Sequence, residues 1–130
     1  MLVTESRSGQ LRPENNRIDG MHLHALDAWV REAAVLTDAD RLRAILYAGA
    51  VAGGARVVGE EFCVFPNGAV TGVLVLAQSH LSIHTWPEFG LANIDLLSYG
   101  DLRADAVLRA ICDELNVERA RLSRIPRAIA

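Results

Sequence analysis

The sequence predicts an α+β fold, a two-layer sandwich in which a largely antiparallel sheet carries two helices on one face. Two segments repeat apolar residues at helical spacing and begin with acidic residues. The other apolar segments are short, rich in β-branched residues and bounded by turn signals. The predicted order is strand, helix, three strands, helix, strand. With 130 residues, we expect one domain over residues 21–130 after a polar, flexible N-terminal extension, residues 1–20.

The domain is predicted to begin with a strand and a helix. Residues 22–30 (HLHALDAWV) are apolar enough for the first strand. Thr37 is the expected N-cap of the first helix, because two acidic residues follow it within three positions. The pair Gly53-Gly54 is expected to end that helix.

The middle of the domain is predicted to be extended. A strand over residues 55–65 ends at a Pro-Asn-Gly turn signal, residues 66–68. The β-branched segment 70–78 is expected to be a buried central strand, which residues 79–86 continue in extended form until a proline interrupts it. Residues 92–99 form the next predicted strand.

The last two elements are a helix and an edge strand. Residues 101–115 are predicted to be helical, and residues 117–125 alternate and carry arginines, which suits an exposed edge. The buried stripe of the helix is expected to comprise Val107, Leu108, Ile111, Cys112 and Leu115.

Composition narrows the class of protein. Half of the residues are hydrophobic and the net charge is −3, so we expect no nucleic-acid partner. No apolar run is long enough to span a membrane and no signal peptide opens the chain, so we expect a cytoplasmic protein. Two cysteines are too few for a disulfide scaffold. Structural roles are expected for Cys63, Cys112, His22 and His24.

All thirteen basic residues are arginines. Without lysine, the chain itself cannot form a Schiff base through a lysine amine, as pyridoxal phosphate enzymes do. A Walker A phosphate loop is excluded for the same reason.

Reactive side chains concentrate in residues 76–100, a segment that otherwise resembles core strand. His80 and His84 have helical zinc-site spacing, but in a strand they lie about 13 Å apart, so we expect no metal site. The chain also lacks the Gly-x-Ser-x-Gly motif of serine hydrolases.

The stretch SHLSIHTWPEFG, residues 79–90, resembles the signature of the prokaryotic S-adenosylmethionine decarboxylases. These are small pyruvoyl enzymes of polyamine biosynthesis. The similarity includes FPNGAVTG before the signature and ANIDLLSYG after it, and it extends from about Gly20 to the C-terminal helix.

The resemblance implies a chain that cuts itself between Gln78 and Ser79. Ser79 would attack the carbonyl of Gln78 and form an ester, and β-elimination would then cleave the chain. The remaining dehydroalanine would hydrolyse to a pyruvoyl group at the N-terminus of a chain of residues 79–130, leaving a second chain of residues 1–78. The pyruvoyl ketone would form an imine with a small-molecule substrate and accept electrons as carbon dioxide leaves.

The resemblance also implies roles for other residues. His84 and Thr71 would assist self-cleavage, Glu88 would hydrogen-bond the ribose hydroxyls of the substrate, and Phe65 would stack on its adenine. The enzyme would be a homodimer of processed protomers, with active sites at or near the interface.

Two departures from the family pattern leave the substrate open. Tyr99 occupies the position of the cysteine that donates a proton to the carbanion, and a phenol is a weaker acid than a thiol. Ser98 and Cys63 are the other candidate proton donors. Gln78 stands where glutamate is usual before the cleaved bond. Arginine or ornithine decarboxylation, or an inactive paralogue with an interaction role, therefore remain alternatives to S-adenosylmethionine decarboxylation.

Overall fold

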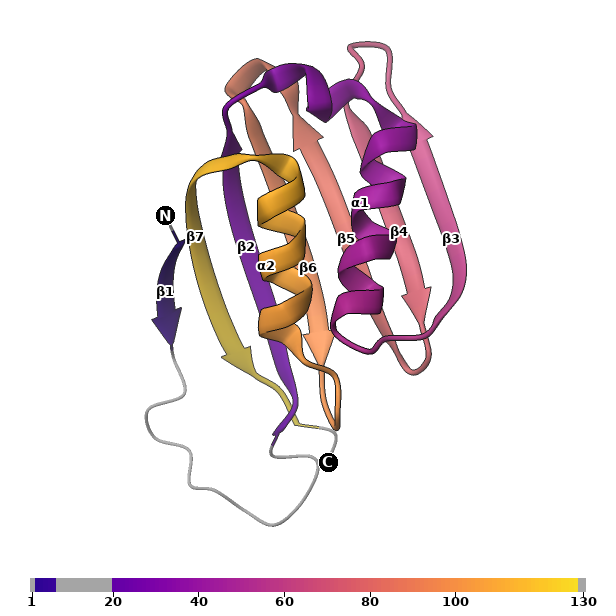
Figure 1. Ribbon diagram of the computed structural model, residues 1–130, viewed down its shortest axis with the longest axis vertical. Coiled ribbons are helices and arrows are strands. Elements are labelled where there is room, and N and C mark those ends of the chain that lie inside the picture. The colour runs from indigo at the N-terminus through magenta and orange to yellow at the C-terminus, as the bar shows by residue number, and fades with distance from the viewer. Residues whose placement is uncertain (1, 7–19, 129–130) are drawn as a thin grey trace.

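A computed structural model describes residues 2–6 and 20–128, with side chains from residue 20 onward. A seven-stranded sheet, in the order β1-β7-β2-β6-β5-β4-β3, carries both α-helices on one face (Figure 1). All neighbouring strands are antiparallel except β1 and β7, so the predicted fold class is confirmed. The strands are β1 (Leu2–Ser6), β2 (His22–Val30), β3 (Val57–Val64), β4 (Val70–Leu76), β5 (Ser79–Trp86), β6 (Leu91–Ser98) and β7 (Val117–Pro126); the helices are α1 (Ala39–Ala52) and α2 (Ala104–Leu115), with short 3₁₀ helices η2 (Ala33–Thr37) and η3 (Pro87–Phe89).

The hydrophobic core lies between the sheet and the two helices. Strand residues alternate between buried and half-buried, as in β6, because successive side chains point to opposite faces. Every second residue of β2, β4, β5 and β6 packs toward the helices. The fully buried large side chains are Leu26, Leu36, Leu42, Ile45, Leu46, Leu74, Leu81, Ile83, Ile94, Leu96, Ile111 and Leu115.

No described helix covers the opposite face of the sheet (Figure 1). We call it the open face. One row of side chains, most of them polar, crosses the open face, because strand pairing places these residues directly opposite one another on neighbouring strands. From β3 to β7 the row contains Cys63, Thr71, His84, Asn93, Asp27 and Arg121.

Three sequence predictions need correction at the chain ends and at the first helix. The N-terminal extension is not wholly flexible, because Leu2–Ser6 forms β1; residues 7–19 lie outside the described part. β1 pairs in parallel with β7, which is therefore not an edge strand. The N-cap of α1 is Asp38 rather than Thr37: the Asp38 carboxylate accepts a 3.0 Å hydrogen bond from the Arg41 N–H.

The predicted extended segment 70–86 is two strands. β4 and β5 form an antiparallel hairpin in which Leu76 pairs with Ser79, so Ala77 and Gln78 make a two-residue turn. Neither turn residue is Gly, Asn, Asp or Pro, so the usual sequence signal for a turn is absent. The hairpin places the bond predicted for cleavage at the end of the sheet.

Candidate active site

The backbone at the predicted cleavage bond is strained. Gln78 has φ 59°, the left-handed conformation that residues with a Cβ seldom adopt and that costs about 1–2 kcal/mol. The N–H of Ala77 donates a 2.9 Å hydrogen bond to the carbonyl of Arg56, which anchors the turn to the start of β3. The structure therefore holds the peptide bond between Gln78 and Ser79 beside an uncommon backbone geometry.

Two hydrogen bonds connect this turn to the end of β6. The half-buried Ser79 hydroxyl donates to the carbonyl oxygen of Leu97. The Tyr99 hydroxyl donates to Oε1 of Gln78 at 2.5 Å. The residues on both sides of the candidate cleavage bond are thus fixed by the chain segment that leads to Tyr99.

A cavity of about 250 Å³ opens beside Ser79. It is bounded by the end of the β4–β5 hairpin, the loop after α1 and the loop before α2. Its lining includes Ser79, Tyr99, Arg56, Asp101 and Leu102. The volume can hold a small polar group next to the Ser79 side chain.

His84 and Thr71 form a second cluster, on the open face near the other end of β5. Thr71 Oγ1 lies 2.6 Å from His84 Nδ1. The His84 ring meets the Trp86 ring edge-on, with 4.5 Å between centroids, and Phe65 lies 6.2 Å away. The structure therefore brings together three of the residues that the sequence singled out: Thr71, His84 and Phe65.

Exposed aromatic rings extend this second cluster. Phe65 is 44% exposed, Trp86 39% and Phe89 65%, and Trp86 and Phe89 lie 6.5 Å apart. Glu88, on η3 between these two aromatic residues, is exposed as well. The surface offers flat apolar rings and a carboxylate to a ligand that has an aromatic base and hydroxyl groups.

A polar chain orients Trp86 and continues along the row on the open face. The indole N–H of Trp86 donates to Oδ1 of Asn93 at 2.6 Å, and the Asn93 amide donates to Asp27 at 2.8 Å. Nearby, burial raises the pKa of Asp95, His80 partly offsets this shift, and Asp27 adds a smaller increase. The sequence analysis did not identify Asn93, Asp27 or Asp95, because their proximity depends on strand pairing.

The two clusters do not meet within one chain. Ser79 and His84 are five residues apart on one strand, which is about 17 Å. Cys63 is exposed on β3 and pairs with Thr71, so it lies at the His84 end and away from Tyr99. Ser98 is buried and lies 2.9 Å from His24.

Within the described residues, no three His, Cys, Asp or Glu side chains could hold a metal ion. None of the described helices is both long enough and apolar enough to cross a membrane.

Comparisons with known proteins show which family this chain resembles. A model of the S-adenosylmethionine decarboxylase family matches residues 22–128. The chain is 34% identical over 110 residues to an S-adenosylmethionine decarboxylase proenzyme of Pyrococcus abyssi, covering 83% of this chain and 78% of that one. A proenzyme of the same name from Symbiobacterium thermophilum is 51% identical over 73 residues, 55% of each chain.

A solved structure shows the same fold. The adenosylmethionine decarboxylase of Aquifex aeolicus VF5 superposes with a TM-score of 0.76 and 28% identity, covering 86% of this chain and 94% of that one. The family match spans the whole described domain from β2 to β7, including the strained turn and the aromatic cluster. The chain therefore belongs to the S-adenosylmethionine decarboxylase family.

Proposed function

We propose that this chain is a self-processing S-adenosylmethionine decarboxylase that makes its own pyruvoyl group from Ser79. The observation that carries the proposal is the geometry of the turn. Ser79 follows Gln78, which has φ 59°. The Ser79 hydroxyl donates a hydrogen bond to the Leu97 carbonyl, and a cavity lies beside Ser79. Two free cysteines fit a reducing compartment, and we place the enzyme in the cytoplasm.

Self-cleavage begins with the Ser79 hydroxyl. Its oxygen bonds to the carbonyl carbon of Gln78, the C–N bond of that peptide breaks, and the hydroxyl proton passes to the freed amine. The left-handed conformation of Gln78 destabilises the intact turn, and it can relax once the shift to the ester and the later elimination separate Gln78 from residue 79. The family membership supports the later elimination and hydrolysis that convert Ser79 to pyruvoyl.

The residues around Ser79 fit a pyruvoyl group. The adjacent cavity of about 250 Å³ can admit the reacting end of a substrate beside it. The pyruvoyl carbonyl supplies an electron sink that this lysine-free chain cannot provide through a lysine-bound cofactor. Tyr99 lines the same cavity, so its hydroxyl is placed to deliver a proton once cleavage frees it from Gln78.

The aromatic cluster fits S-adenosylmethionine better than arginine or ornithine. Phe65 and its neighbours offer exposed rings for an adenine base, and Glu88 offers carboxylate oxygens for ribose hydroxyls. Arginine and ornithine carry neither a base nor a ribose. We therefore assign Phe65 and Glu88 to substrate binding.

A complete site requires two copies of the chain. Ser79 and the His84–Thr71 pair lie about 17 Å apart, too far for direct proton transfer. The open face carries the His84 cluster and no described helix covers it, so a second copy can pack there and bring its own His84 to Ser79. We propose a homodimer in which each site combines Ser79 of one chain with His84 and Thr71 of the other.

The direct test is to measure cleavage and decarboxylation separately. We expect intact mass to show chains of residues 1–78 and 79–130, the latter with an N-terminal pyruvoyl group. Carbon dioxide should be released from S-adenosylmethionine at least 100-fold faster than from arginine or ornithine. This ratio corresponds to a difference of about 3 kcal/mol in activation free energy, which the contacts to adenine and ribose supply. A chain that stays intact contradicts the enzyme proposal, and faster release from arginine or ornithine contradicts the substrate.

Replacing Tyr99 with Phe tests the proton donor. The variant loses the hydrogen bond to Gln78, but the Ala77–Arg56 bond still anchors the turn, so cleavage should slow only several-fold. Turnover of the cleaved enzyme should fall by about 10²–10⁴, the usual effect of losing a general acid. Tyr47→Phe is the matched control, because its hydroxyl donates to Glu60 on β3 and neither residue lines the cavity beside Ser79. Unchanged turnover in Tyr99→Phe would exclude Tyr99 as the donor.

A further inference from the structure

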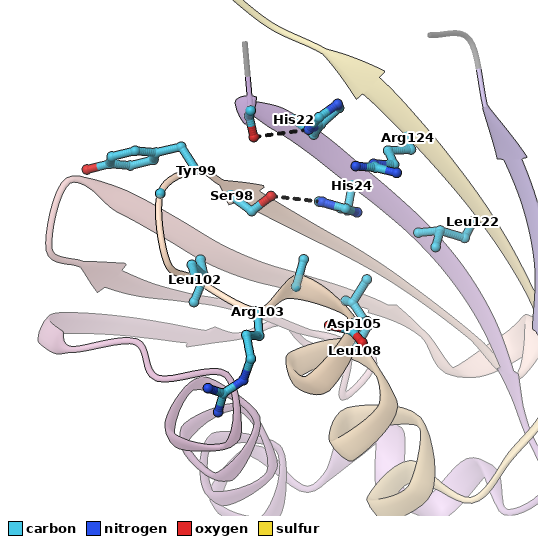
Figure 2. A pocket seen from close by; sticks show the side chains of 13 residues that line it. His22, His24, Ser98, Tyr99, Leu102, Arg103, Asp105, Leu108, Leu122 and Arg124 are labelled. Atoms are coloured by element: carbon cyan, nitrogen blue, oxygen red, sulfur yellow. Dashed lines mark hydrogen bonds between the residues drawn. The ribbon is translucent and has the colours of Figure 1, made fainter. Parts of the chain in front are cut away.

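A second cavity, of about 400 Å³, lies on the helix-bearing face of the sheet (Figure 2). It is enclosed by β2, the end of β6, β7 and the N-terminal turn of α2. Ser79, His84 and Glu88 are not part of it, and Tyr99 is at its border with the ring directed away from Ser98 and His24. Its polar lining includes His22, His24, Ser98, Asp105 and Arg124.

His24 has an unpartnered polar atom in this cavity. The residue is 7% exposed, and its Nε2 lies 2.9 Å from the Ser98 hydroxyl oxygen. Its Nδ1 is buried and has no hydrogen-bond partner among the described residues. Such groups are rare, because burial without a partner costs about 1–3 kcal/mol.

The tautomer of the His24 ring depends on its charge state and on its hydrogen bond with Ser98. Burial, then the positive charge of Arg124, holds the pKa of His24 down to about 4, so the ring is neutral at pH 7. If the Ser98 hydroxyl donates to Nε2, the single ring hydrogen is on Nδ1. The ring then holds a buried N–H donor at the cavity wall that lacks an acceptor among the described residues.

Arg124 adds a positive charge at the mouth of the cavity. It is exposed and has no ion-pair partner among the described residues, and Figure 2 shows it beside the rings of His22 and His24. The first turn of α2 also lines the cavity through Ala104 and Asp105, and no side chain caps its backbone N–H groups. Arg103, the residue before α2, turns its guanidinium away to the carbonyl of Ala52.

We propose that this cavity binds a small oxyanion, a carboxylate or a sulfate-like group. Arg124 holds it at the mouth, His24 donates from Nδ1 at the floor, and the first turn of α2 contributes N–H groups. Asp105 is the acidic side chain in the lining, and its negative charge opposes that of a bound anion. The proposal does not rest on decarboxylase activity, because none of its residues takes part in self-cleavage.

Binding should be coupled to protonation of His24. The charged or titratable groups that act on His24 are Arg124 on β7 and His22 on β2. Asp105 on α2 and Tyr99 after β6 line the same cavity, with the Tyr99 ring directed away from His24. A bound anion stabilises the imidazolium and raises the pKa of His24 from about 4. The complex then takes up a proton, so affinity increases as pH falls from 7.5 to 5.5.

The test uses the full chain with Ser79→Ala, so that no pyruvoyl group is present. Sulfate and acetate are titrated separately, by calorimetry and by ¹H–¹⁵N spectra of the histidine rings. We expect saturable single-site binding and tighter sulfate binding at pH 5.5 than at pH 7.5. In the anion-free chain at pH 7.5, the single ring hydrogen of His24 should be on Nδ1. A neutral His24 ring with its hydrogen on Nε2 in the anion-free chain at pH 7.5, or no saturable binding, overturns the proposal.

Two arginine variants separate the site from general charge. Arg124→Gln should weaken sulfate binding about tenfold, because one charge-assisted hydrogen bond is lost. Arg119→Gln is the matched control: Arg119 is on the same strand but stacks on Trp29, 3.8 Å from the ring centroid. Equal weakening in both variants overturns the proposal.

Competition identifies the source of the anion. If S-adenosylmethionine displaces sulfate and its decarboxylated form does not, the substrate carboxylate is the ligand. If neither displaces sulfate, the site takes a free anion.

Discussion

Ser79→Ala is expected to give an intact 130-residue chain with no decarboxylase activity. Alanine has no nucleophile for the carbonyl of Gln78, so neither the ester nor the pyruvoyl group can form. Loss of the group that accepts electrons should reduce turnover below detection, a far larger effect than the removal of a binding contact. Intact mass spectrometry and carbon dioxide release from S-adenosylmethionine measure the two losses in one sample.

Folding can be separated from chemistry in this experiment. The Ser79 hydroxyl makes one hydrogen bond, to the Leu97 carbonyl, so its removal should cost about 1 kcal/mol of stability. Ser82→Ala is the matched control, because Ser82 is half-buried on the same strand. It should cleave and turn over at the rate of the unmodified chain. A Ser79→Ala chain that still decarboxylates would show that the electron sink comes from elsewhere.

The strands, helices and turns that short sequence patterns determine were predictable from the sequence. The first strand occupies the predicted residues 22–30, and the apolar stripe of the second helix is buried as expected, apart from the half-buried Cys112. The Pro-Asn-Gly turn between β3 and β4 follows from residues with intrinsic turn preference. These predictions needed no knowledge of which strands pair.

Features that depend on distant contacts were not predictable. The turn at Ala77 and Gln78 has no turn residue, and contacts with Arg56 and Tyr99 hold it instead. The strand over residues 117–126 is not at the edge of the sheet as predicted, because β1, from the N-terminal end of the chain, pairs with it. His24 and Ser98 are 74 positions apart, so only the register of β2 and β6 brings them together.

The candidate site shows the same division. The signature residues Ser79, His84 and Glu88 stand out in the sequence by their concentration in a short apolar segment. Their distribution over two separate clusters follows from the strand geometry, since five residues of a strand span about 17 Å. The sequence motif therefore identifies the participants, whereas the distance between them along β5 is the basis for the proposal that two chains share each site.

A mixture of two inactive chains should restore self-cleavage. His84→Ala leaves Ser79 intact but removes the proton-transfer group, so alone it should cleave about 10²–10⁴-fold more slowly. Ser79→Ala alone cannot cleave. In a mixed dimer, the His84 of the Ser79→Ala chain lies at the interface with the Ser79 of its partner, and one complete site forms. With equal amounts and random pairing, about half of the His84→Ala chains should be cleaved.

The control distinguishes sharing of the site from any general effect of mixing. His84→Ala combined with the double variant Ser79→Ala/His84→Ala should remain uncleaved, because no chain then supplies His84. A denaturing gel with a tag on one chain identifies which variant is cut. Size-exclusion chromatography measures the fraction of the protein that is dimeric. Uncleaved mixed dimers would place His84 outside the partner's site, and a monomer that cleaves itself would contradict the dimer. Restored cleavage requires that the open face of one chain reaches the turn of another, because a proton cannot pass directly over the roughly 17 Å along β5 within one chain.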